Sequence, residues 1–98
     1  MMDKNQILYI LKSQKDYLQQ RYGIEVIGVF GSVARGENNE NSDIDILYKF
    51  KDKKLSLFEY MQLLSELEEK FHTKVDLVRE DKIKPFLKEY IQKDIINV

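Results

Sequence analysis

Two aspartates one residue apart, Asp43 and Asp45, are the side chains in this sequence best suited to chemistry. In a strand, residues two apart point to the same face, so both carboxylates would project opposite the apolar side chains of Ile44 and Ile46. Paired carboxylates repel each other. Mg²⁺, which typically binds one or two carboxylates together with substrate phosphates, would offset that repulsion. Taken alone, an Asp-X-Asp pair is more often two solvated acids at a strand end.

A glycine and a serine, Gly31-Ser32, follow an apolar run and precede a segment compatible with a short helix. Gly31 permits a tight turn and a close backbone approach. Ser32 could cap the helix, whose free N–H groups favour an anion, or its hydroxyl could bind a phosphate oxygen. Alone, Gly-Ser is a common strand–helix joint. The fixed spacing to Asp43 and Asp45 is more specific, with a chance agreement on the order of 1 in 50,000 per start position.

Arg35 lies about one helical turn beyond Ser32. From there its guanidinium could bind a phosphate through two nitrogen atoms. It could equally pair with Glu37 or Asp43, or contact a partner protein. The sequence leaves these alternatives open.

The elements that must position these residues follow from hydrophobic periodicity, which predicts the order α-β-α-β-α-β-α. Helices packed on a small sheet, an α/β (α+β) fold, are the expected result. Capping pairs, an early proline and a stop glycine mark the helix ends. The predicted strands are 24–30, 43–50 and 74–79, the capping pairs are Asp3 with Gln6 and Ser56 with Glu59, Gly23 ends the first helix, and Pro85 lies in the first turn of the last.

Composition excludes several classes of function. Sixteen Lys and Arg against 17 Asp and Glu give a net charge of −1, so direct nucleic-acid binding is not expected. There is no cysteine and only one histidine, His72, which excludes thiolate metal sites and disulfides. No signal peptide or membrane span is visible. We expect a cytoplasmic protein whose 98 residues form a single domain, 1–98.

The run Gly31-Ser32-Val33-Ala34-Arg35-Gly36, followed by Ser42-Asp43-Ile44-Asp45-Ile46-Leu47, resembles the minimal nucleotidyltransferases of the polymerase-β superfamily. Among these it is most similar to the MNT antitoxins, the partners of HEPN-domain toxins. The resemblance covers nearly the whole chain. It implies a mixed sheet with helices packed on it, ATP as substrate and two Mg²⁺ ions.

The resemblance also assigns roles to individual residues. It implies a third carboxylate on the next strand, which is Asp76; without the resemblance, Asp76 would be an ordinary acid at a strand edge. Asp43, Asp45 and Asp76 would be the catalytic, metal-binding residues, with Asp43 bridging the ions. Asp76 would bind the catalytic metal or accept the proton of the nucleophile. The nucleotide-binding residues would be Gly31 and Ser32, at the β- and γ-phosphates, and Arg35.

The implied function is AMP transfer from ATP to a protein hydroxyl. The implied target is a tyrosine of a cognate HEPN ribonuclease toxin, so the chain would act as a type VII-like antitoxin. Two alternatives remain open. The chain could neutralise its partner by binding alone, with the acids as ancestral remnants. It could instead modify a small molecule, although such enzymes usually carry an added domain for the acceptor.

Overall fold

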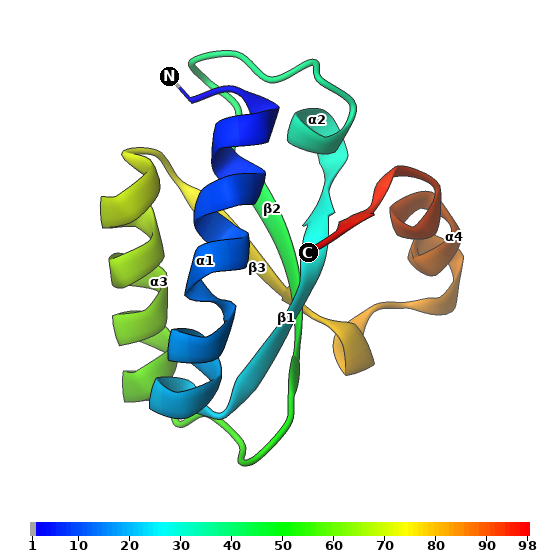
Figure 1. The fold of residues 1–98 in the computed structure, drawn as a ribbon. Coiled ribbons are helices and arrows are strands. Elements are labelled where there is room, and N and C mark those ends of the chain that lie inside the picture. Colours follow the sequence, from blue (N-terminus) through cyan, green and yellow to red (C-terminus); the bar gives the residue numbers. More distant parts are fainter. Residues whose placement is uncertain (1) are drawn as a thin grey trace.

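The predicted alternation of helices and strands is present in the computed structural model, which describes residues 2–98 (Figure 1). Within those residues, no helix has the length and apolar character needed to cross a membrane. The elements in chain order are α1 (Lys4–Tyr22), β1 (Ile24–Phe30), α2 (Gly31–Ala34), β2 (Ile44–Phe50), α3 (Leu57–Phe71), β3 (Val75–Arg79), the 3₁₀ turn η1 (Glu80–Lys82), α4 (Pro85–Asp94) and β4 (Ile96–Asn97).

The strands form one mixed sheet in the order β3-β2-β1-β4. β1 is antiparallel to β2 and to β4, whereas β2 and β3 are parallel. Parallel neighbours need a crossover connection, and α3 supplies it between β2 and β3. The expectation of a mixed sheet with helices packed on it is therefore confirmed.

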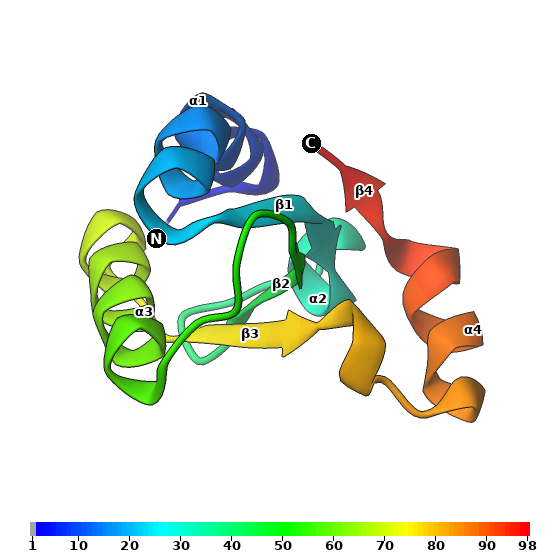
Figure 2. The ribbon, with the colours of Figure 1, turned by 90° about the horizontal axis from the view of Figure 1, so that it is seen from below.

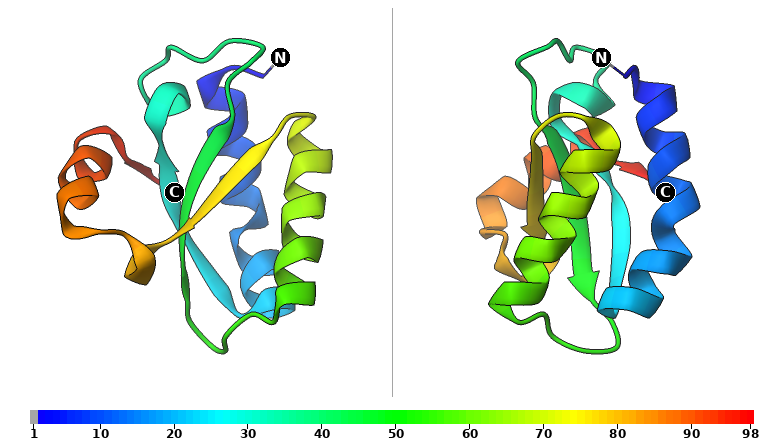
Figure 3. Two further views of the ribbon diagram at one scale, coloured as in Figure 1. Left: turned by 180° about the vertical axis from the view of Figure 1, so that it is seen from behind. Right: turned by 90° about the vertical axis from the view of Figure 1, so that its left-hand side faces the viewer.

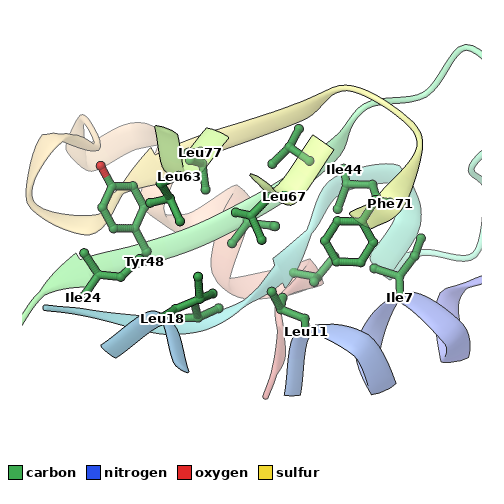
Figure 4. Close-up of a cluster of buried hydrophobic side chains, with 14 of the residues drawn as sticks. Ile7, Leu11, Leu18, Ile24, Ile44, Tyr48, Leu63, Leu67, Phe71 and Leu77 are labelled. Carbon is green, nitrogen blue, oxygen red and sulfur yellow. The ribbon is translucent and has the colours of Figure 1, made fainter. Parts of the chain in front are cut away.

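One face of the sheet is closed by α1 and α3, which lie side by side against it (Figure 2). Alternate residues of the strands point into this layer, as the period-2 pattern of β2 predicted. Figure 4 shows the apolar side chains of both helices meeting those of the strands. The core cluster includes Ile7, Leu11, Leu18, Tyr22, Ile24, Val26, Val29, Ile44, Ile46, Tyr48, Leu63, Leu67, Phe71, Val75 and Leu77.

The ends of the two long helices are set by local hydrogen bonds that the sequence predicted. Asp3 with Gln6 caps α1, and Ser56 with Glu59 caps α3, each as a complete capping box. Gly23 ends α1 in the left-handed conformation, with φ of 71°. Because these signals are encoded within a few residues of each other, they survive in the folded chain unchanged.

The opposite face is covered only in part, by α4, and the C-terminal strand β4 extends the edge of the sheet beside β1 (Figure 3). Pro85 begins α4 as predicted. The helix ends at Asp94, before Ile95, and the chain then forms β4, which the sequence did not predict because two residues show no periodicity. Gly28 makes this pairing possible, since a Cβ there would overlap the carbonyl oxygen of Ile96.

Candidate active site

Asp45 and Asp76 lie side by side on the open face of the sheet. They are register partners in the parallel pair of β2 and β3. Their neighbours Ile44, Ile46 and Leu77 are buried in the core, so alternation places both carboxylates on the other face. The structure therefore brings together two acids that are far apart in the sequence.

The electrostatics of this pair are unfavourable for two free carboxylates. Burial, followed by the negative charges of Asp76 and Asp43, raises the pKa of the Asp45 carboxyl to about 6. The positive charge of Arg35 offsets only part of this effect. The ionised site thus holds more negative charge than the protein itself neutralises.

Asp43 occupies a different position from the one that a continuous strand predicts. It lies one residue before β2 and is exposed. Across residues 2–98, no three His, Cys, Asp or Glu side chains converge closely enough to hold a metal ion. Of the three predicted acids, the structure pairs Asp45 with Asp76. The third, Asp43, contributes a negative charge near Asp45 but does not join a three-residue cluster.

The paired acids nevertheless fit a divalent cation. Mg²⁺ commonly binds one or two carboxylates and completes its coordination with water and substrate phosphates, so it does not require an all-protein cage. The raised pKa of Asp45 reflects negative charge that such an ion would neutralise. Asp45 and Asp76 would be the residues to hold it, with the charge of Asp43 nearby.

Gly31 is packed directly against the Asp45 carboxylate. Its φ of +76° lies in the left-handed region, and a Cβ built on it would overlap the Asp45 carboxylate oxygen. Both observations require glycine at this position. The Gly-Ser turn and the acid pair, which the sequence offered as separate features, therefore form one site.

The interpretation of Ser32 as a helix cap is wrong. α2 begins at Gly31, its N-cap residue is Phe30, and no side chain caps it by hydrogen bonding. Ser32 is the second residue of the helix, because the left-handed glycine turns the chain one residue earlier than a serine cap would. Its backbone carbonyl accepts a hydrogen bond from the amide of Glu37 at 2.9 Å.

Arg35 forms ion pairs with two acids. Its guanidinium donates to Asp94 of α4 at 2.7 Å and to Glu37 at 3.2 Å. Pairing with Glu37 was one of the predicted alternatives, and pairing with Asp94 was not. The contact with Asp94 depends on where α4 packs, which the sequence did not indicate. Arg35 therefore links the end of α2 to α4 beside the acids.

A groove of about 580 Å³ opens next to the acid pair. Gly31, Arg35 and Asp76 line one part of it, and α4 forms the opposite wall. The groove residues of α4 could not be assigned to a site from the sequence, because their helical spacing is also typical of core packing. The exposure of Phe86 and Tyr90 shows that they lie outside the core.

Comparison with known proteins agrees with this arrangement. The family model "Polymerase beta, Nucleotidyltransferase" matches residues 12–98. A protein adenylyltransferase, MntA, of Thermococcus cleftensis is 36% identical over 98 residues, covering 100% of this chain and 98% of MntA. A solved structure with the provisional description of a minimal nucleotidyltransferase is 34% identical, with a TM-score of 0.79, over 99% of this chain and 97% of its own.

A more distant solved structure shares the fold at 21% identity, with a TM-score of 0.58 over 96% of this chain and 66% of its own. It is a tri-AMPylated Shewanella oneidensis HEPN toxin in complex with an MNT antitoxin. The family assignment itself depends on the match to the family and on the relatives above 30% identity. The chain belongs to the polymerase-β nucleotidyltransferase family.

Proposed function

We propose that this chain transfers AMP from ATP to a hydroxyl group of a partner protein. The observation that carries the proposal is the pairing of Asp45 and Asp76 directly against the Gly31 turn. Family membership supports nucleotidyl transfer, and the name of the Thermococcus relative supports a protein as acceptor.

In the proposed reaction, an acceptor hydroxyl oxygen bonds to the α-phosphorus as the bond to the β-phosphate breaks, and pyrophosphate leaves. Asp45 and Asp76, with Asp43, would hold Mg²⁺, which when bound supplies positive charge between these carboxylates and the triphosphate. Alternatively to binding the catalytic metal, Asp76 would accept the proton of the acceptor hydroxyl. Gly31 and Ser32 would hold the β- and γ-phosphates.

Arg35 is proposed to bind the nucleotide after exchanging its present partners. Its side chain is 44% exposed, and the carboxylate of Glu37 is 65% exposed. The ion pair with Glu37 is therefore well screened by solvent, and the shorter pair with Asp94, whose side chain is 26% exposed, is the one that the nucleotide would have to replace. A triphosphate, which carries more charge and accepts two hydrogen bonds from one guanidinium, can therefore compete for Arg35.

The proposed acceptor is a HEPN toxin, as the resemblance of the active-site run implies. The Shewanella complex shows such a toxin carrying three AMP groups beside a protein of this fold. A target that brings its own folded surface also suits a chain whose elements are largely used for the core and the acid site.

The direct test mixes the chain with a HEPN protein co-encoded with it, where the neighbouring gene supplies one, together with ATP and Mg²⁺, and measures the intact masses of both proteins. The toxin is expected to gain one or more AMP units on a tyrosine. Asp45→Asn is expected to slow transfer at least about a thousandfold, about 4 kcal/mol of transition-state stabilisation. Asp16→Asn, an exposed acid of α1, is the matched control and should leave transfer unchanged.

Neutralisation of the toxin by binding alone, without AMP transfer, gives a different outcome. A toxin silenced with no mass change, and equally well by the Asp43→Asn/Asp45→Asn double variant, would defeat the catalytic proposal. Metal dependence is tested separately by titrating ATP into the protein with Mg²⁺ and with EDTA. Equal affinity in both titrations would contradict the proposed role of the ion.

A further inference from the structure

α4 exposes large apolar side chains that the core of the fold does not bury. Phe86 is 65% exposed, Leu87 43% and Tyr90 67%. They lie at positions i, i+1 and i+4 of one helix, so they form a continuous apolar surface over about one turn. α4 contains no buried residue. A cluster of this kind on an otherwise charged protein is typical of an interaction site.

The position of this surface distinguishes it from other exposed apolar residues. Phe86, Leu87 and Tyr90 line the same groove as Gly31 and Asp76. Whatever fills the groove therefore lies within reach of the proposed reacting phosphorus. Phe58 on α3 and Tyr9 on α1 are exposed to a similar degree, but both lie on the helices that close the opposite face (Figure 2).

We propose that the groove between β3 and α4 is the docking site for the acceptor protein, which inserts apolar side chains next to the hydroxyl it presents to Asp76. This inference rests on the proposed function and names where its protein substrate binds. The occupant is a folded protein segment rather than the adenine ring. Val78, Ile83 and Ile91 line the groove beside the exposed rings and suit apolar side chains of a partner, whereas the polar groups of the lining are the Tyr90 hydroxyl and the charged groups of Arg35, Asp76, Lys82, Lys84 and Asp94.

Charge and area support a protein occupant. Arg35, Lys82 and Lys84 line the groove together with Asp76 and Asp94, and Arg35 is already paired with Asp94. The two lysines therefore favour acidic residues beside the apolar segment of the partner, away from Asp76. Standard protein interfaces bury about 800 Å² on each partner. An interface of that size would cover roughly an eighth of the 6376 Å² of accessible surface of the described chain.

The experiment compares two double variants that remove equally exposed aromatic rings. Phe86→Ser/Tyr90→Ser changes the groove, and Phe58→Ser/Tyr9→Ser is the matched control. Affinity for the co-encoded HEPN protein is measured by calorimetry without nucleotide, and affinity for ATP with Mg²⁺ is measured separately. We expect the groove variant to bind the protein at least tenfold more weakly, since buried aromatic anchors dominate interface energies. Its ATP affinity should stay within twofold of the unmodified chain, as should both affinities of the control.

Each other outcome overturns the inference. Lost ATP affinity with intact protein affinity would place the adenine in the groove. If the groove variant alone sediments more slowly than the unmodified chain, and still binds the HEPN protein with unaltered affinity, a second copy of the chain covers α4. Equal weakening by both double variants would show that α4 has no special role. Because protein binding is measured without ATP, failure of AMP transfer in the intact-mass test would leave this result interpretable.

Discussion

The two faces of the sheet are built on different principles. On the closed face, α1 and α3 bury an apolar layer and begin in complete capping boxes. On the open face, α4 buries no residue, and two carboxylates lie side by side with one of them packed against Gly31. The closed face follows the rules that stabilise a fold, and the open face departs from them where the candidate site lies.

This difference indicates that one face of the sheet provides most of the stability and the other carries the candidate site. Stability gained by packing on one face lets the other keep exposed apolar side chains and unneutralised charge, features that are costly in themselves but useful for binding and catalysis. If the two faces differ in this way, changes on the closed face should alter stability alone. Changes on the open face should alter function with little loss of stability, or even with a gain.

The largest expected effect on stability is in the core. Leu63, fully buried between α3 and the sheet, contributes transfer energy and fills space that alanine would leave empty. Leu63→Ala should lower the free energy of unfolding by about 2–5 kcal/mol. Urea titration followed by circular dichroism measures it. Met61→Ala on the same helix, where the side chain is 60% exposed, should change stability by less than about 0.5 kcal/mol. Equal losses at both positions would contradict the assignment of the core.

A smaller loss of stability is expected at two glycines with positive φ, Gly31 and Gly36. Comparing alanine variants at these positions separates the cost of backbone strain from the effect on the geometry of the site. Gly31 has φ of +76° against the Asp45 carboxylate, whereas Gly36 has φ of +73° and no atom within 4 Å of the position that a Cβ would take. Alanine at either position should cost about 1–2 kcal/mol of stability from left-handed strain. Only Gly31→Ala should also abolish AMP transfer, because it displaces Asp45. Comparable activity in the two variants would break the link between the turn and the acids.

The smallest effect is a difference in pH dependence between the faces, measured by thermal unfolding in EDTA. The Asp45 pKa is raised to about 6, so the folded state retains a proton that the unfolded chain loses, and stability should fall as pH rises from about 4 to about 7. On the closed side, Glu59 lies in the first turn of α3, and a hydrogen bond from the ammonium of Lys53, which precedes the helix, lowers the pKa of Glu59 to about 2. Stability from Glu59 is therefore present above its unfolded pKa and is lost as pH falls toward 2.

Two variants check these signs. Asp45→Asn should remove the decline in stability between about pH 4 and 7 and raise the melting temperature of the metal-free protein at neutral pH. Glu59→Gln should flatten the acid limb and leave the neutral range unchanged. If Asp45→Asn instead lowers the melting temperature at pH 7, the acid pair is a stabilising feature and the contrast between the faces fails.

Much of the local structure could be predicted from the sequence because its determinants lie close together along the chain. The capping pairs, the stop at Gly23, Pro85 at the start of α4 and the alternation of β2 are all encoded within a few residues. The active-site run was recognisable for the same reason, since Gly31, Ser32, Asp43 and Asp45 keep a fixed spacing. These features depend on backbone geometry and short-range hydrogen bonds, which the tertiary fold does not alter.

What only the tertiary structure decided are the contacts between distant segments. The parallel register of β2 and β3 puts Asp76 beside Asp45, and the path of the C-terminus puts Asp94 on Arg35. The same path leaves Phe86 and Tyr90 exposed although their spacing suits a core helix. Helical periodicity states which residues share a face, but not what that face meets. Only the packing of whole elements determines whether it is buried, bound to a partner or open to solvent.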